Sequence, residues 1–211
     1  MCICGNAAID GFLTVGRVNR DDYDDMLIIN ASGSLIVYYG APGGLFSTTA
    51  NLSTAFAPYR DLALGKLNNI GYDSLYAINS STGVWYQFTG LAAGGFNMTP
   101  VQTGSGWGCC KLNTFGKFNH DDYLDLATVE VATGKLRIYP GTANNTLGIG
   151  AVDENAGAAW LNRDVAAIHS EVTGRDSLLA KDLPTGALNL YPSDPNGGVD
   201  WSDPISYGTR Y

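Results

Sequence analysis

A polar turn motif recurs along the chain at an interval of about 50 residues. It is clearest at residues 116–126, recurs at residues 16–26, and has a weaker copy at residues 65–75. The lead glycines are 49 and 51 residues apart. A period near 50 is what the multi-strand blades of a β-propeller require. This recurrence constrains the fold more than any other feature of the sequence.

Each unit follows the same order of short apolar segments. The expected first, second and third strands are residues 12–15, 26–29 and 35–38; 61–64, 75–78 and 85–88; 112–115, 126–129 and 136–139; and 165–168, 178–181 and 188–191. A hairpin turn with Gly33, Gly83, Gly134 or Gly186 precedes each third strand, because glycine supplies the positive φ that such turns need.

The third strands alternate between two faces. One face is expected to hold Leu35, Trp85, Leu136 and Leu188, and the other Tyr38, Phe88, Tyr139 and Tyr191. Trp85 takes the place of a leucine in its sister units, which assigns it to the core. Fourth strands are expected to start at Phe46, Phe96, near Leu147 and at Trp201. No segment shows sustained helical periodicity.

These patterns predict one all-β domain over residues 1–211. It is a β-propeller of four-stranded antiparallel blades, with four repeats of about 50 residues at about 8–56, 57–107, 108–160 and 161–211. Four units fit a closed four-bladed ring, and they equally fit part of a larger propeller that more chain or a second copy completes. The sequence leaves both alternatives open.

The motif resembles the FG-GAP repeat, also called VCBS, which typically reads G-D-F-N-G-D-G-x-x-D-L and builds integrin-α-like propellers. The resemblance rests on residues 115–126 and the copies above. The copy in the fourth unit, at residues 165–179, keeps the glycine and leucine but has lost the leading acids. It implies a Ca²⁺ turn with ligands at positions 1, 3, 5 and 9 and a carbonyl at position 7. The matching side chains are Asn19, Asp21, Asp25, Asn119, Asp121 and Asp125.

Position 1 departs from the family pattern, because it is Arg17, Lys66 or Lys117 rather than aspartate. We therefore expect the basic side chain to replace the metal by pairing with the carboxylates at positions 5 and 9. The rival interpretation is a weakened Ca²⁺ site in units one and three. In unit two, Ile70 and Ser74 stand where acids belong, and no other cofactor is expected.

The charge balance excludes several classes of partner. The net charge is −8, so the basic surface that nucleic acids require is missing, and an anionic membrane surface would repel the chain. No stretch approaches the roughly 20 apolar residues of a membrane span, so membrane insertion is not expected.

Several features favour an extracellular, glycosylated protein, although the chain starts without a signal-peptide pattern. Five Asn-x-Ser/Thr sequons occur at Asn30, Asn51, Asn79, Asn97 and Asn144. The four cysteines form two tight pairs, Cys2/Cys4 and Cys109/Cys110, whose spacing does not suit zinc. Disulfides are favoured over free buried thiols, and three pairings are open.

No catalytic constellation can be read from the sequence. His120 lies in a motif turn. For neither His120 nor His169 does the residue spacing identify a partner nucleophile, so an enzyme is not expected. The more informative residues are aromatics that recur before each inner strand: Phe56, Trp107, Trp160 and Tyr211. They either plug the gaps between blades or stack on sugar faces.

We expect a non-catalytic secreted binding module that recognises a carbohydrate, in a lectin-like manner, or a protein surface. The alternatives are a structural subunit that assembles with copies of itself as a homo-oligomer, and an accessory module of a larger secreted enzyme. Some secreted propellers that carry this repeat are lectins, which favours the carbohydrate by family analogy.

Overall fold

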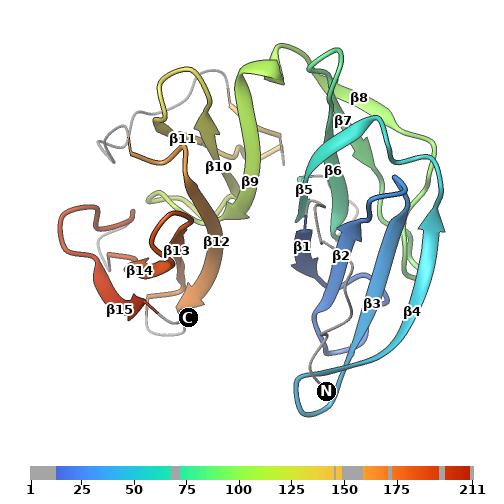
Figure 1. The fold of residues 1–211 in the computed structure, drawn as a ribbon, viewed down its shortest axis with the longest axis horizontal. Coiled ribbons are helices and arrows are strands. Elements are labelled where there is room, and N and C mark those ends of the chain that lie inside the picture. Colours follow the sequence, from blue (N-terminus) through green and yellow to red (C-terminus); the bar gives the residue numbers. More distant parts are fainter. Residues whose placement is uncertain are drawn as a thin grey trace.

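The computed structural model describes residues 13–67, 72–144, 146–148, 159–170, 173–194 and 198–209. These residues form antiparallel sheets placed around a common centre, with one 3-10 turn, η1 (Trp107–Cys109) (Figure 1). The chain is therefore an all-β protein with the arrangement of a four-bladed propeller, as the repeat predicts. No helix in the described ranges is long and apolar enough to cross a membrane.

Each blade is built from consecutive strands, numbered outward from the centre. Blade 1 holds β1 (Leu13–Gly16), β2 (Asp25–Ile29), β3 (Leu35–Ala41) and β4 (Leu45–Ser53). Blade 2 holds β5 (Tyr59–Gly65), β6 (Ser74–Asn79), β7 (Trp85–Phe88) and β8 (Val101–Gly104). Blade 3 holds β9 (Cys110–Gly116), β10 (Asp125–Glu130) and β11 (Leu136–Tyr139). Blade 4 holds β12 (Arg163–Ser170), β13 (Arg175–Asp182), β14 (Ala187–Tyr191) and β15 (Ile205–Thr209).

The fourth strands differ most from the sequence expectation. Phe96 pairs with Gly90 only through an isolated bridge, and strand β8 starts five residues later, at Val101. Trp201 likewise precedes β15, and Leu147 pairs with Gly141 in an isolated bridge. The predicted starts in units two and four are thus wrong. Phe96 closes the bend after the third strand instead of entering the ladder, and Trp201 packs on Trp160 and Tyr191 before β15 begins. Residues 149–158 lie outside the described chain.

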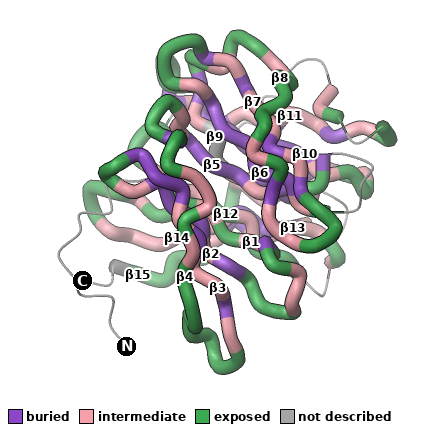
Figure 2. Tube along the Cα trace, turned by 90° about the vertical axis from the view of Figure 1, so that its right-hand side faces the viewer, coloured by how far each residue is buried: buried purple, intermediate pink, exposed green. Residues whose placement is uncertain are grey.

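The hairpins follow the turn chemistry of the sequence. Gly33, Gly83, Gly134 and Gly186 all have φ between 64° and 74°, in the left-handed region. Buried positions lie mainly in the inner strands of the blades, and exposed positions gather in the turns and in the outer strands β4 and β8 (Figure 2).

The cores lie between blades. The innermost strands are neighbours in the order β1, β5, β9 and β12 around the centre (Figure 1). Three apolar clusters fill the successive junctions: Leu27, Val37, Leu75 and Phe88 belong to the first, Tyr76, Trp85, Phe115 and Leu126 to the second, and Ala127, Ile138, Leu178 and Tyr191 to the third. The two expected faces of the third strands therefore pack against two different neighbouring blades.

Candidate functional site

A buried acceptor at position 9 of the motif organises the turn in all four blades. Its side chain accepts a hydrogen bond from a backbone N–H in the bend after the third strand. The four pairs are Gly40 to Asp25 (2.9 Å), Gly90 to Ser74 (3.1 Å), Gly141 to Asp125 (2.8 Å) and Ser193 to Ser177 (2.9 Å). Aspartate and serine both perform this task, so the turn forms in units that have lost the acid.

The two aspartates take further backbone donors within their turns. In unit one, Asp25 Oδ2 accepts the N–H groups of Val18 (2.8 Å) and Asn19 (3.0 Å). In unit three, Asp125 Oδ2 accepts the N–H of Phe118 (2.8 Å), and its Oδ1 accepts Asn119 Nδ2 (2.9 Å). Both oxygens of each carboxylate are therefore occupied by N–H donors.

The remaining motif side chains bond to one another. Asn19 Nδ2 donates to Asp21 Oδ2 (2.8 Å), and Asn119 Nδ2 donates to Asp121 Oδ2 (3.1 Å). Asp121 Oδ1 also accepts the N–H of Tyr123 (2.9 Å). The side chains implied as calcium ligands thus lie together in each turn and form a closed hydrogen-bond network.

The expected replacement of the metal by a basic side chain is wrong in unit three. Lys117 Nζ lies 3.9 Å from Asp122 Oδ1, at position 6, and not on the carboxylates at positions 5 and 9. Asp122 is largely exposed and also faces Arg175, at 3.4 Å. Backbone N–H groups satisfy the buried carboxylates, which leaves the lysine at the surface, where such a pair contributes little.

Among the carboxyl groups of these turns, Asp125 has a strongly raised pKa. Burial raises the pKa of its carboxyl to about 6, against the lowering effect of the N–H donors from Gly141 and Phe118. Within the described ranges, no group of three or more His, Cys, Asp or Glu side chains is placed to hold a metal ion.

The recurring aromatics separate into two kinds. Phe56 is only 2% exposed and Trp160 only 1%, so both rings fill the core between two blades. Trp107 is half-buried at the equivalent place, and Tyr211 lies outside the described residues. Of the four residues predicted to bind a ligand, Trp107 is the one that the described structure leaves accessible.

The aromatic residues share one backbone contact that explains their recurrence. The N–H groups of Phe56, Trp107 and Trp160 donate to the carbonyls of Gly33, Gly83 and Gly134 in the preceding blade, at 2.9, 2.9 and 3.0 Å. Each contact joins the entry of one blade to the hairpin of the previous one. The interpretation of these residues as plugs therefore holds for Phe56 and Trp160.

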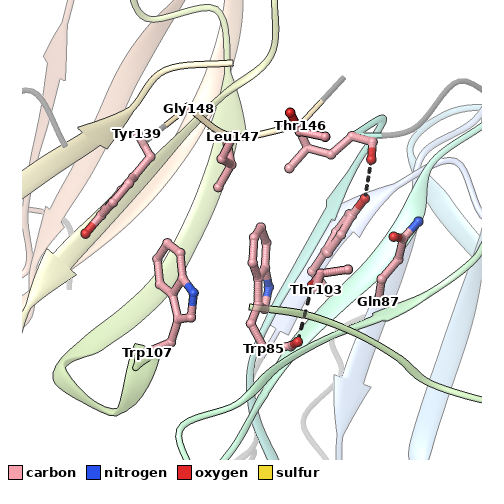
Figure 3. A pocket seen from close by; sticks show the side chains of 10 residues that line it. Trp85, Gln87, Thr103, Trp107, Tyr139, Thr146, Leu147 and Gly148 are labelled. Carbon is pink, nitrogen blue, oxygen red and sulfur yellow. Dashed lines mark hydrogen bonds between the residues drawn. The ribbon is translucent and has the colours of Figure 1, made fainter. Parts of the chain in front are cut away.

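A cavity of about 350 Å³ opens beside Trp107, between blades 2 and 3. Figure 3 shows Tyr139 and Leu147 of blade 3 on one side, and Trp85, Gln87 and Thr103 of blade 2 on the other. The centroid of the Trp107 ring lies 5.0 Å from that of Trp85 and 4.9 Å from that of Tyr139. Tilted aromatic rings thus form the base of the cavity.

Polar groups lie among these rings. Thr103 Oγ1 donates to the Trp85 carbonyl (3.2 Å), and Gln87 Nε2 donates to Ser74 Oγ (3.2 Å). The second bond leaves Gln87 Oε1 as an acceptor. The buried Trp85 Nε1 has no hydrogen-bond partner in the described structure. The cavity therefore combines aromatic faces with the free acceptor of Gln87, whereas the unpaired Trp85 N–H is buried.

Sequence reasoning placed Trp85 in the core, which is correct, but it did not find the cavity. Gln87 carried the available signal, because Val37 and Ile138 occupy the same place in the third strands of blades 1 and 3. A polar side chain at a position that sister repeats fill with apolar ones marks a junction that is not fully packed. Thr103 and Thr146 carry no such signal.

The other candidate residues have structural roles. His169 Nδ1 lies 2.9 Å from Asp176 Oδ1, and the same carboxylate accepts the N–H of Lys117 (2.7 Å), which joins blades 3 and 4. A disulfide links the adjacent residues Cys109 and Cys110, at the end of η1. Cys2 and Cys4 lie outside the described residues.

The five sequons fall into two groups. Asn30 and Asn79 stand at the same hairpin position, where each side-chain Oδ1 accepts hydrogen bonds from residues of its own turn. Asn51, Asn97 and Asn144 are exposed. The exposed group is the more accessible to a glycan in the folded protein.

The chain matches no family model, and no curated protein matches it. The FG-GAP resemblance therefore stays a prediction from the motif.

Proposed function

We propose that this chain is a non-catalytic binding module that takes a carbohydrate in the cavity between blades 2 and 3. The observation that carries the proposal is the half-buried Trp107, which stands where Phe56 and Trp160 are fully buried. At the other two junctions the ring fills the gap between blades. Here it borders a cavity of about 350 Å³ instead.

The lining suits a sugar because it offers both surfaces that a sugar needs. Apolar C–H faces pack on aromatic rings, here Trp107 and Tyr139, which come from opposite sides of the junction. Hydroxyl groups need donors and acceptors, here the second N–H of Gln87 Nε2 and the carbonyl Gln87 Oε1. Gln87 lines the cavity, where a sugar hydroxyl would pair with these groups.

The first test replaces Gln87 by valine, the residue that blade 1 has at this place. Gln87→Val is expected to preserve the fold, because an apolar side chain already packs at the equivalent position of two other blades. Loss of one acceptor is expected to weaken binding about tenfold, which corresponds to about 1.4 kcal/mol. A glycan array identifies the sugar class, and isothermal titration with the best hit measures the effect.

The second variant, Trp107→Ala, removes the stacking surface and is expected to abolish measurable binding. Tyr207→Ala, which removes an exposed ring far along the chain in β15, is the matched control and should bind as the native protein does. An array without reproducible hits, or equal affinities for the native protein and Trp107→Ala, would contradict the proposal.

A further inference from the structure

Consecutive blades bury the same two faces at each of the three junctions inside the chain. We call the side of a blade that packs on the next blade its forward face, and the opposite side its backward face. At the first junction, Leu27 and Val37 on the forward face of blade 1 pack with Leu75 and Phe88 on the backward face of blade 2. The other two junctions repeat this arrangement.

One forward face and one backward face have no such partner in the described structure. The forward face of blade 4 carries the apolar side chains of Ile168, Leu179, Leu188 and Leu190, together with Asp164 and Lys181 at its edge. The backward face of blade 1 consists of Leu13, Val15, Met26, Ile28, Ile36 and Tyr38. The described strands β1 and β12 make no contact comparable to those between β1 and β5, β5 and β9, or β9 and β12.

Several side chains on the two faces are exposed, although Ile28 on the backward face of blade 1 is buried. Leu13, Val15 and Ile168 are 50%, 53% and 43% exposed. Leu188 is half-buried, whereas Leu35 and Leu136 at the same repeat position are fully buried. Large apolar side chains that are core elsewhere in the repeat therefore meet solvent here, which is a mark of an interaction surface.

Polar contacts that join blades also lack their counterparts at these faces. The backbone N–H of Arg17 in blade 1 bonds to Asp73 in blade 2, and that of Lys117 in blade 3 bonds to Asp176 in blade 4. Asp24 occupies this repeat position in blade 1, and its exposed carboxylate makes no hydrogen bond within the described chain. Blade 1 thus presents an acceptor that is used at two of the internal junctions.

We propose that a second copy of this chain covers both open faces. The forward face of blade 4 in each copy packs on the backward face of blade 1 in the other, so that two copies form one head-to-tail pair. The choice of a second copy follows from the packing inside the chain. There, each forward face packs on the backward face of the next blade. A heterologous contact of this kind closes when its rotation permits.

Closure of one chain on itself is the competing arrangement. Apolar clusters fill the three internal junctions, with the cavity beside Trp107 at the second. In the described structure, β1 and β12 make no contact comparable to those inside the chain, and side chains on both faces meet solvent.

The test uses one charged substitution on each open face. Val15→Lys alters the backward face and Ile168→Glu the forward face, and both side chains already meet solvent in the single chain. Light scattering after size exclusion at micromolar concentration is expected to give about 45 kDa for the native protein, twice the 22.3 kDa of one chain. Each variant is expected to give the mass of one chain.

Leu183→Lys is the control, because Leu183 is an exposed apolar residue in the hairpin of blade 4, outside both faces. It should keep the native mass, and circular dichroism should show the same β signal for all four proteins. Val15→Lys and Ile168→Glu mixed in equal amounts should recover a pair, because each contributes one intact face to a shared junction. A native mass of one chain, a pair that both substitutions leave unchanged, or growth into longer polymers would overturn the proposal.

Discussion

A single buried acceptor ties each motif turn to the bend that follows the third strand. Asp25, Ser74, Asp125 and Ser177 all receive a backbone N–H across a gap of 15 or 16 residues. An unsatisfied buried N–H is costly, so the acceptor contributes to stability whether it is a carboxylate or a hydroxyl. This role explains why the turn recurs in a unit that has lost its leading acids.

The acid in blade 3 gives a prediction for pH dependence. Burial raises the pKa of Asp125 to about 6 in the folded protein, above the ordinary value of 3.8. The folded state thus binds this proton more tightly than the unfolded chain, so the contribution of Asp125 to stability rises as the pH falls from 7 towards 4. Asp125→Asn, which cannot titrate, isolates the effect by comparison with the native protein. In thermal scans, the melting temperature of the native protein minus that of the variant should increase as the pH is lowered from 7.5 to 5. A difference that stays constant over this range would contradict the assignment.

The same hydrogen bonds lead to a prediction for calcium. Both oxygens of Asp25 and of Asp125 already accept N–H groups, so a cation would have to displace formed bonds. A site of micromolar affinity would stabilise the protein by about 4 kcal/mol at millimolar Ca²⁺. We expect no such gain when Ca²⁺ is added to chelator-treated protein, as measured by the midpoint of urea unfolding. A saturable rise of the midpoint would support the rival interpretation of a weakened calcium site.

At the scale of the strand and turn, the hairpin glycines link neighbouring blades. Gly33 has φ of 74°, and a Cβ at this position would lie 2.4 Å from the Cβ of Ala57, in the entry to blade 2. The Gly33 carbonyl also accepts the N–H of Phe56. The turn therefore needs glycine for two reasons, the backbone conformation and the close approach of the next blade.

A pair of substitutions separates these two reasons. Gly174 has φ of 65° but open space around its Cβ position. Gly174→Ala is expected to cost about 1 kcal/mol of stability from the backbone conformation alone. Gly33→Ala adds the clash with Ala57 and is expected to cost distinctly more. Urea denaturation of both variants measures the difference, and equal costs would show that the close approach has no energetic weight.

Many of the strands and hairpin turns could be predicted from the sequence, for a physical reason. The second strands are short, almost continuously buried apolar runs, and the third strands alternate between two faces. A polar turn and a hairpin glycine bound them, so their positions follow from local chemistry. The fourth strands of units two and four were placed too early because Phe96 and Trp201 suggest a strand. Phe96 instead bridges to Gly90, and Trp201 packs on Trp160 and Tyr191 ahead of β15. The cavity beside Trp107 depends on how two blades fit together, which no single repeat encodes.

At the scale of the whole molecule, the repeat both builds the core and leaves it incomplete. Each blade buries one face on the blade before it and one on the blade after it, so its stability depends on its neighbours. Blades 1 and 4 each have one neighbour in the described structure, and they carry the exposed Leu13, Val15 and Ile168. Assembly with a second copy would give every blade two neighbours.

This coupling of assembly to stability predicts a melting temperature that depends on concentration. If the native state is a pair of chains, mass action favours it as the protein concentration rises. A tenfold increase contributes about 1.4 kcal/mol per pair, and a change of this size shifts the melting temperature of such a chain by a few degrees. Thermal scans at 2 and 20 µM monomer should therefore differ for the native protein and coincide for Val15→Lys. The control Leu183→Lys should follow the native protein. Scans of the native protein that coincide at both concentrations would show that the open faces of blades 1 and 4 are not joined between copies.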